Sequence, residues 1–378
     1  MKLRAARRMD GIDRTLIRQI FDSAPAGAIN LGLGQPDLPT PPRISLAGAA
    51  GIAAGRTVYT STGGDPALRA AIARRYEPFA TGAENVVVTV GSQEAVFASV
   101  LTLCDPGDEV LYPDPGYPAY CVVARLVGAV PVAYPLRAAR GFRLDPADIE
   151  ARLTDRTRLV IVCSPSNPTG AVERAEDLAR LAELLERRGI AWLSDEIYAG
   201  FAYDGPVPSL SSFSREGGLV VSGVSKDLSM TGWRIGWAVG AAAIIARIVV
   251  AHQYLVTCAS SISQSAALAA LSGDAEPERA AYLEIFRRRR ALMAEELSRI
   301  PRIRFDLPQG AFYFFVDFSA YGSSVDLCRR VLERRKVITI PGEAFGSEGA
   351  GYVRISFAAT EEQIALGIRA IAEEIGGT

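Results

Sequence analysis

Short apolar runs alternate with amphipathic helical stretches along much of the chain, and this alternation constrains the fold more than any other feature. One helical stretch covers residues 173–188, where Leu178, Leu181 and Leu185 share a face and Gly189 ends the pattern. Strands that alternate with helices predict a mostly parallel sheet with helices on both faces, which is a three-layer α/β fold. The apolar runs that predict strands cover residues 86–90, 109–112, 159–163, 191–194 and 219–222.

The pattern changes near residue 281. A charged helical stretch at 282–299 precedes apolar runs at 312–318 and 352–357, with a further helix between them, and this predicts a smaller α+β domain. A chain of 378 residues exceeds what one hydrophobic core usually serves. We therefore expect a large domain over residues 45–280 and a small domain formed by residues 1–44 together with 281–378.

Three local features have simple interpretations. The segment 29–42, rich in Gly and Pro, predicts an ordered loop that joins the small domain or lies over a site. The four arginines at 287–290 would point all round a helix, which favours a solvated face over a basic binding patch. His252 is the single histidine and has no evident partner for catalysis or for a metal, so we expect a structural role and no metal site.

The composition excludes several classes of partner. Lys plus Arg number 41 and Asp plus Glu number 42, so nothing favours nucleic acid or an anionic membrane. The longest apolar run, at 236–246, is too short to span a bilayer, and no apolar stretch follows the basic residues 1–9 as in a secretory signal. The five cysteines are scattered and odd in number, which predicts free thiols in a reducing cytoplasm.

Ligands of open α/β sheets bind beyond the carboxyl ends of the strands, so the residues that follow each predicted strand are the candidates for a site. Gly91, Ser92 and Gln93 follow one strand at the start of a helix, a place suited to phosphate, although a plain serine cap also explains them. The prolines at 165 and 168 fix a turn around Asn167, which either aims an amide outward or simply leads into a helix.

The next two strand ends carry charge. Asp195 ends an apolar strand and needs a cationic partner if it is buried, and Tyr198 follows three residues later; a structural ion pair is the alternative. Lys226 follows a buried strand, where desolvation makes an amine nucleophilic, and Arg234 can take a phosphate bidentately. An amine, an anion cradle and a carboxylate for a ring N–H suit a phosphorylated pyridine aldehyde. No dinucleotide-binding or P-loop motif follows any predicted strand.

From about residue 31 to the end, the chain resembles the class I/II aminotransferases, which are pyridoxal 5'-phosphate (PLP) enzymes of fold type I. The motifs that carry the resemblance are SPSNPTG at 164–170, SDEIY at 194–198 and SKDLSMTGWRIG at 225–236. The resemblance implies that the large domain binds PLP in a three-layer PLP-transferase fold. It also implies a homodimer that acts on small-molecule amino acids and 2-oxo acids.

The resemblance implies a role for each matching residue. Lys226 holds PLP as a Schiff base and later moves a proton at the substrate. Asp195 pairs with the pyridine N1–H and keeps the ring able to accept charge. Tyr198 and Asn167 hydrogen-bond the 3-oxygen of the ring. The phosphate is held by Arg234, Ser92, Gln93 and Ser225.

Four more positions complete the implied site. Tyr117 stacks on the ring face, and Arg354 grips the α-carboxylate of the substrate. Gly34 lies in a loop that closes over the substrate. Tyr59 reaches the phosphate in the partner subunit, so two chains share each active site.

The chain also departs from the family pattern. Gly223 stands where some branches have a serine, so one phosphate contact is missing or replaced. Tyr117 stands where several aspartate-specific members have tryptophan. No second arginine is identified for a side-chain carboxylate, so an aromatic, aliphatic or broad substrate range stays open. The aromatic residues expected either to line a side-chain pocket or to belong to the core are Phe21, Tyr120, Phe312 and Tyr313.

The leading hypothesis is a PLP-dependent aminotransferase that moves an amino group from an L-amino acid to a 2-oxo acid by a ping-pong mechanism. One alternative keeps the cofactor but makes the chain a carbon–sulfur β-lyase or another Cα-eliminating or cyclising biosynthetic enzyme. A remote alternative is a non-enzymatic, aminotransferase-like regulator. We expect the segment before residue 31 to be too short for the DNA-binding domain of such a regulator.

Overall fold

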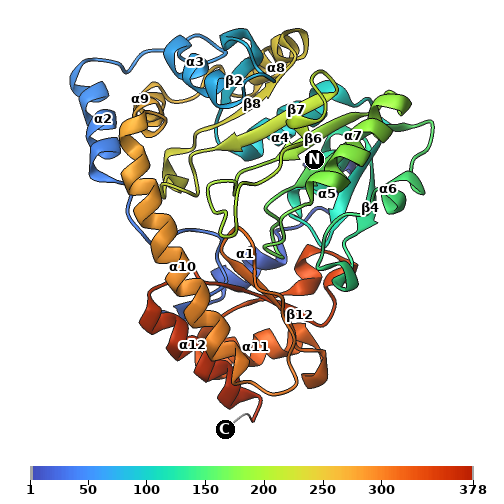
Figure 1. Ribbon diagram of the computed structural model, residues 1–378, viewed down its shortest axis with the longest axis vertical. Helices are drawn as coiled ribbons and strands as arrows, with labels where there is room; N and C mark the ends of the chain where they lie inside the picture. The colour runs from blue at the N-terminus through green and yellow to red at the C-terminus, as the bar shows by residue number, and fades with distance from the viewer. Residues whose placement is uncertain (1–2, 377–378) are drawn as a thin grey trace.

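A seven-stranded sheet forms the centre of the computed structural model, which describes residues 3–376 (Figure 1). The strand order is β2-β8-β7-β6-β5-β3-β4, and only β8 runs antiparallel to its neighbours. The predicted mostly parallel α/β sheet is therefore confirmed. Its strands are β2 (Val86–Thr89), β3 (Glu109–Asp114), β4 (Val130–Pro135), β5 (Thr157–Cys163), β6 (Ala191–Asp195), β7 (Gly218–Gly223) and β8 (Gly236–Gly240).

Helices cover both faces of this sheet, because successive side chains of a strand point to opposite faces. In β5, Val160 and Val162 belong to one core, which includes residues of α2, α3, α6, α7 and α9. Leu159 and Ile161 belong to the opposite core with α4, α5 and α8. These helices are α2 (Pro42–Ala53), α3 (Pro66–Arg75), α4 (Ser92–Leu103), α5 (Ala119–Val127), α6 (Pro146–Glu150), α7 (Ala175–Arg188), α8 (Ala242–Val256) and α9 (Ser261–Ala270).

A second, smaller α+β region packs around its own core of buried aromatic and aliphatic side chains. Its antiparallel sheet has the order β11-β12-β9, and β1 pairs in parallel with β10. The long helix α10 runs from beside α9 to beside α12 (Figure 1). The elements of this region are β1 (Ile29–Asn30), α10 (Glu276–Ser298), β9 (Tyr313–Asp317), α11 (Ser324–Arg335), β10 (Val337–Ile338), β11 (Ile340–Pro341), β12 (Tyr352–Ser356) and α12 (Glu361–Glu374). Ile17 and Ile20 of the N-terminal helix α1 (Leu16–Asp22) pack against a core of the large sheet instead.

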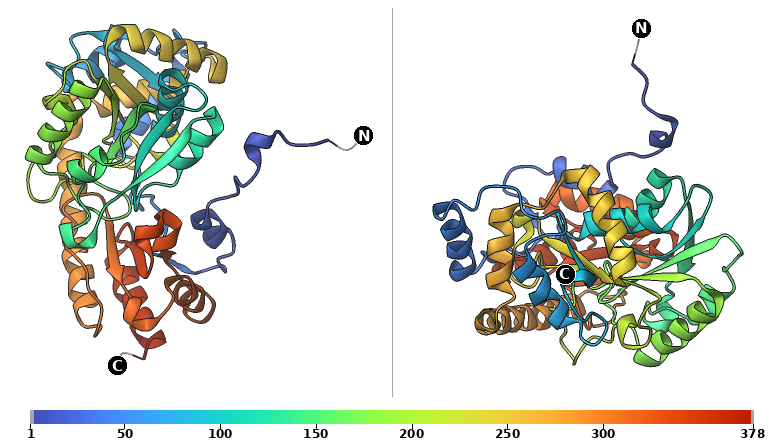
Figure 2. Two further views of the ribbon diagram at one scale, coloured as in Figure 1. Left: turned by 90° about the vertical axis from the view of Figure 1, so that its right-hand side faces the viewer. Right: turned by 90° about the horizontal axis from the view of Figure 1, so that it is seen from above.

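The placement of the N-terminal segment fits both expectations for residues 29–42. Pairing of β1 with β10 joins the segment to the small region. The residues that follow β1 lie against Lys226, whose amine donates to Gly34 O. The chain before α1 projects from the molecule (Figure 2), and its short helix η1 (Arg7–Met9) lies beside α5. The predicted domain boundary at 280/281 lies inside the continuous helix α10, and the domain limits stay a prediction.

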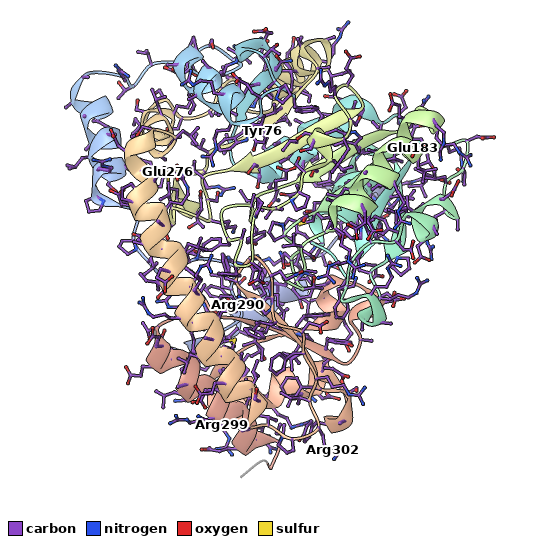
Figure 3. The ribbon with its side chains drawn as sticks, viewed as in Figure 1. Tyr76, Glu183, Glu276, Arg290, Arg299 and Arg302 are labelled. Carbon is purple, nitrogen blue, oxygen red and sulfur yellow. The ribbon has the colours of Figure 1, made fainter. Side chains whose placement is uncertain are left out.

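The four arginines at 287–290 are only partly the solvated face that the sequence predicted, because Arg287 and Arg288 are exposed whereas Arg289 and Arg290 are not. Arg289 is buried and forms two hydrogen bonds, of 2.6 and 2.9 Å, with the carboxylate of Asp37 in the N-terminal loop. Arg290, midway along α10 (Figure 3), pairs with Asp204 at 2.9 Å. These guanidinium groups tie α10 to segments distant in sequence, and such long-range partners leave no local sequence signal.

Three further observations concern the role of His252, membrane-spanning helices and metal sites. The imidazole of His252 is fully buried, and its Nδ1 lies 2.8 Å from Glu94 Oε1, as expected of a structural histidine. No helix within residues 3–376 is both long and apolar enough to cross a membrane. The same residues contain no group of three or more His, Cys, Asp or Glu side chains arranged to hold a metal ion.

Candidate active site

A cavity of about 650 Å³ opens at the carboxyl ends of the parallel strands. The strands bring its polar residues together because their ends are in register: Cys163 pairs with Asp195 in the sheet, and Asp195 pairs with Val221. Predicted site residues that line it are Gly34, Ser92, Gln93, Tyr117, Asn167, Asp195, Tyr198, Ser225, Lys226, Arg234 and Arg354. Tyr59 lies outside this lining, and 83% of its surface is exposed.

Lys226 presents a desolvated amine to the cavity. Its Nζ donates a 2.7 Å hydrogen bond to Gly34 O and lies 5.7 Å from the centre of the Tyr198 ring. Burial, with a further contribution from the nearby cations Arg234 and Arg354, lowers the pKa of Lys226 to about 8. Roughly a tenth of the amine is therefore neutral at pH 7, far more than for an ordinary lysine, and the neutral amine is the nucleophilic form.

Asp195 is a buried carboxylate that lacks a cation in direct contact within the described residues. Its Oδ2 accepts a 2.8 Å hydrogen bond from the Tyr120 hydroxyl, and its Oδ1 accepts one of 3.2 Å from Ile197 N–H. Burial raises the pKa of Asp195, and these two donors with the charge of Lys226 oppose that rise. A buried carboxylate of this kind is suited to bind a protonated ring nitrogen.

Arg354 is 2% exposed and is held in one orientation. Its Nη1 donates to Asn167 Oδ1 at 2.7 Å and its Nη2 to Gly32 O at 2.5 Å. The guanidinium lies between two aromatic rings, 4.4 Å from the centre of Tyr313 and 4.7 Å from that of Phe345. Arg354 Nε has no hydrogen-bond partner among residues 3–376. A fixed guanidinium that still offers donors is suited to a carboxylate.

The residues expected to hold a phosphate surround the start of α4. Gly91 has a φ of +78°, and a Cβ there would overlap the guanidinium of Arg234, so glycine allows the close approach. The amide groups of the first turn of α4 point out of the helix end, where they favour an anion. Gln93 Oε1 accepts a 3.1 Å hydrogen bond from the Tyr117 hydroxyl.

The structure explains the glycine at position 223. A Cβ on Gly223 would lie 2.7 Å from Ile235 O, closer than real side chains approach, and 3.0 Å from Gly236 Cα, which is unusually tight. No serine fits at this position without a shift of β8, so the contact found in other branches is absent here.

Of the four aromatic residues whose role the sequence left open, three line the cavity: Phe21, Tyr120 and Tyr313. Phe312 is completely buried and belongs to the core of the small region. The hydroxyl groups of Tyr313 and Tyr198 lie 2.8 Å apart, so the two phenols form one hydrogen-bonded pair.

Sequence reasoning missed the N-terminal helix α1 as part of the cavity wall. Arg14 and Arg18 line the cavity, two arginines that the sequence did not identify as candidates for a substrate side-chain carboxylate. Arg18 Nε lies 3.0 Å from Asp22 Oδ1, and 60% of the Arg18 side chain is exposed. Thr15 caps this helix by accepting from Arg18 N–H, a signal that predicts the helix but not its location.

Comparison with known proteins decides the family. The profile described as "Aminotransferase class I and II" matches residues 26–371. The chain belongs to this family. A probable aspartate/prephenate aminotransferase of Aquifex aeolicus is 38% identical over 91% of this chain and 90% of that protein. A probable N-acetyl-LL-diaminopimelate aminotransferase of Bacillus subtilis is 37% identical over 90% of this chain and 87% of its own length.

Solved structures agree with this assignment. The aspartate aminotransferase of Thermus thermophilus with maleate superposes with a TM-score of 0.93, at 32% identity, over 99% of this chain and 100% of that one. The protein is therefore a transaminase of the three-layer aminotransferase fold, and its cofactor is PLP. The residues present fit this group: the cavity offers a partly neutral amine, a buried carboxylate without a contacting cation, and an arginine beside a helix N-terminus.

Proposed function

We propose that this aminotransferase moves the amino group of an L-amino acid to a 2-oxo acid in two half-reactions of a ping-pong cycle. The observation that carries the proposal is that Lys226, Asp195 and Arg354, from three distant parts of the chain, line one cavity. PLP, when bound, supplies an aldehyde that captures amino groups and a ring that accepts electrons. The protein residues would provide binding, orientation and proton transfer.

In this proposal Lys226 has two tasks. Its amine would attach the cofactor and, when free, would take a proton from the substrate Cα and deliver it to the cofactor carbon bonded to the amino nitrogen. The lowered pKa of Lys226, about 8, suits both directions of transfer near neutral pH. Asp195 would hold the proton on the ring nitrogen, because its carboxylate is buried and hydrogen-bonded in place.

The remaining residues would bind and orient. Arg354 with Asn167 would fix the substrate carboxylate, since their mutual hydrogen bond already positions the guanidinium. Gly34 lies on the loop over Lys226. Tyr117 would cover one ring face, and Tyr198 with Asn167 would hydrogen-bond the ring oxygen. We assign the phosphate to Ser92, Gln93, Ser225 and Arg234, and to Tyr59 of the partner subunit in a homodimer.

The substrate does not follow from the relatives, because their names differ: one is described as acting on aspartate and prephenate, another on N-acetyl-LL-diaminopimelate. Arg18 of α1 and Arg14, just before this helix, line the cavity and add a reason to include acidic amino acids among the donors. The scattered free cysteines suit a reducing compartment, so we expect the enzyme in the cytoplasm.

A single-turnover screen of amino donors tests the proposal. Each L-amino acid is mixed with the PLP-loaded enzyme, and conversion of the cofactor to its pyridoxamine form is followed by absorbance. Addition of a 2-oxo acid should regenerate the starting spectrum and yield one new amino acid per site. Release of pyruvate and ammonia from a cysteine conjugate, without any acceptor and in preference to transfer, would overturn the proposal in favour of a β-lyase.

A further inference from the structure

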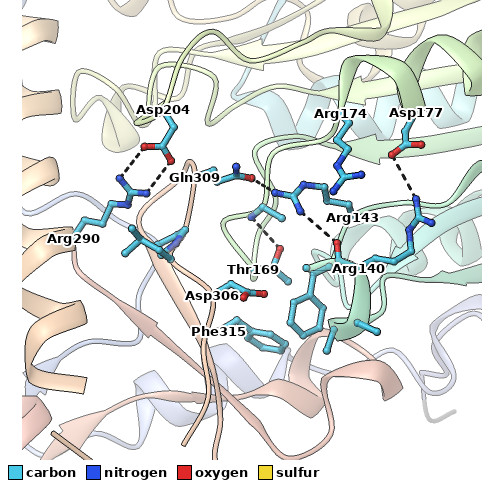
Figure 4. Close-up of a pocket in the computed structure, with 17 residues that line it drawn as sticks. Arg140, Arg143, Thr169, Arg174, Asp177, Asp204, Arg290, Asp306, Gln309 and Phe315 are labelled. Atoms are coloured by element: carbon cyan, nitrogen blue, oxygen red, sulfur yellow. Dashed lines mark hydrogen bonds and ion pairs between the residues drawn. The ribbon is translucent and has the colours of Figure 1, made fainter. Parts of the chain in front are cut away.

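A second cavity, of about 690 Å³, lies where the segments 138–143 and 169–177 meet residues 306–309 (Figure 4). It shares no lining residue with the active-site cavity. Thr169, on its wall, belongs to the same turn as Asn167. The charged side chains that face it are Arg140, Arg143, Arg174, Arg290, Asp177, Asp204 and Asp306.

Some of these charges already neutralise one another. Arg140 Nη2 lies 3.6 Å from Asp177 Oδ2, and its Nη1 lies 2.8 Å from Asp145. Arg290 forms two hydrogen bonds with the Asp204 carboxylate, of 3.3 and 2.9 Å. These pairs stabilise the wall of the cavity and leave little charge free for a ligand.

Arg143, Arg174 and Asp306 differ from these pairs. Arg143 donates only to neutral oxygen atoms, among them Val172 O at 2.9 Å and the side-chain oxygen of Gln309. Within residues 3–376, neither Arg143 nor Arg174 has a carboxylate within 4.0 Å, and Asp306 has no cation within that distance. Figure 4 shows Arg143 and Arg174 pointing into the same cavity. Two guanidinium groups that line one cavity and have no carboxylate within 4.0 Å favour an added anion, although Asp177, Asp204 and Asp306 line the same cavity.

Gly141 leaves a small space between two of these unpaired charges. A Cβ built on Gly141 would lie 2.9 Å from Arg143 Nη1 and 3.7 Å from Asp306 Oδ2. The guanidinium and the carboxylate therefore face one space, yet they do not form an ion pair with each other. Both groups therefore lie near Gly141 at the cavity wall, and a ligand that reaches both would carry a negative and a positive group close together.

We propose that this cavity is a second ligand site, and that its ligand is an α-amino acid. The carboxylate of the ligand binds Arg143 and Arg174, and its ammonium group binds Asp306. An α-amino acid carries both groups on one carbon atom, which matches the two charges that flank Gly141. The site goes beyond the proposed transfer reaction, since none of its residues lines the active-site cavity.

The test uses the PLP-loaded enzyme and two probes, 2-aminoisobutyrate and isobutyrate, which differ only in the ammonium group. The Cα of 2-aminoisobutyrate carries no hydrogen, so transamination does not consume it. Exchange with the cofactor in the active site changes the visible absorption, whereas binding in the second cavity leaves it unchanged. Calorimetry measures the total number of binding sites, which includes both the active site and the second cavity. We expect one site per chain for 2-aminoisobutyrate that is silent in absorption.

Three variants assign that silent site. Arg174→Gln should weaken 2-aminoisobutyrate there by about two- to fivefold, because Arg174 is exposed and an exposed ion pair is worth about 1 kcal/mol or less. Asp306→Asn should weaken 2-aminoisobutyrate but not isobutyrate. Arg187→Gln is the control. Helix α7 begins directly after Arg174, and Arg187 lies near its other end, outside the cavity. The proposal would be overturned if calorimetry detected no binding of 2-aminoisobutyrate beyond the site that changes the visible absorption, even at concentrations that saturate this change. Equal affinities in Arg174→Gln and Arg187→Gln would do the same, and an unchanged probe difference in Asp306→Asn would remove the ammonium contact.

Discussion

The hydroxyl of Tyr120 donates a hydrogen bond of 2.8 Å to Asp195 Oδ2, and both residues are buried. Burial raises the pKa of Asp195, whereas this hydrogen bond lowers it because it stabilises the charged form. Tyr120 also packs edge-on against Tyr117, with ring centres 5.6 Å apart. The tyrosine therefore fixes both the charge and the direction of the carboxylate that we assign to the ring nitrogen.

Replacement of Tyr120 by phenylalanine should weaken PLP binding and turnover. Loss of a hydrogen bond to a buried carboxylate costs about 1.5–3 kcal/mol, which corresponds to roughly 10- to 150-fold. Equilibrium dialysis measures the PLP affinity. The pKa of the pyridine nitrogen of the bound cofactor, followed by absorbance, should fall because a less charged Asp195 holds its proton less tightly. Tyr134→Phe is the control, since Tyr134 is equally buried and donates 2.8 Å to Ile161 O. If both variants bind PLP alike, Tyr120 has no special part in the site.

The uptake of PLP by the apoenzyme should depend on pH. The pKa of Lys226, lowered to about 8 mainly by burial, sets the fraction of neutral amine. The rate of covalent attachment is expected to rise about tenfold per pH unit below this value and to level off above it. Stopped-flow absorbance measures the rate. Lys226→Ala should show no covalent absorption band at any pH, and a rate that keeps rising to pH 10 contradicts the lowered pKa.

Arg354→Ala should raise the KM for the amino donor far more than it lowers kcat. Removal of a buried, charge-assisted partner of a carboxylate typically costs roughly 2–5 kcal/mol. Steady-state kinetics with a saturating 2-oxo acid gives the two constants separately. The exposed Arg304 offers a comparison in the same small region, and Arg304→Ala should leave KM unchanged. An unaltered KM in Arg354→Ala would take this residue out of the substrate site.

Arg18 should discriminate between donors. Its side chain lines the cavity but is 60% exposed, so an ion pair with a substrate carboxylate is worth about 1 kcal/mol or less. Arg18→Gln is expected to lower kcat/KM for aspartate or glutamate by about two- to fivefold, and to leave a neutral donor such as leucine unaffected. The neutral donor is the internal control. Equal losses for both donors would show that Arg18 acts on the fold of α1 instead.

Glu173 should make stability fall as pH rises. Burial raises the pKa of Glu173 from its ordinary 4.5 to about 8, so the folded chain keeps a proton that the unfolded chain releases. Between these two values unfolding releases a proton, and the free energy of unfolding therefore decreases with increasing pH. Glu173→Gln should reduce this loss, measured as Tm at pH 5 and pH 8. Glu176→Gln, at an exposed position of α7, should retain the wild-type dependence.

Local patterns predicted the sheet and its strand ends well. The spacing of apolar residues, two residues in a strand and 3.6 in a helix, is a local property of the sequence. The limits of β5, β6 and β7 therefore lie within a few residues of the predicted runs. Asn167, Asp195 and Lys226 line one cavity because parallel strands end at the same edge of the sheet. The predicted boundary between the domains was less informative, since α10 passes through it.

Contacts between distant segments could not be predicted in this way. Tyr120 has an ordinary aromatic pattern, and its bond to Asp195 spans 75 residues. The ion pair of Arg289 with Asp37 spans 252 residues, which is why the burial of this arginine within the run was not predicted. The second cavity has the same origin, since segments from Ala138 to Phe315 contribute its wall. Three-dimensional placement, not composition, decides these roles.

The turn that carries Asn167 has consequences for how this enzyme can change over evolution. Asn167 faces the cavity of Lys226, Thr169 faces the second cavity, and Gly170 O accepts 2.9 Å hydrogen bonds from Gln309 N–H and Gly310 N–H. Substitutions in this short stretch alter both cavities at once and also disturb the hydrogen bonds of Gly170 to the chain before β9. We therefore expect the sequence of this turn to change slowly in evolution. Substrate preference should be easier to redesign on α1, whose residues line only the active-site cavity.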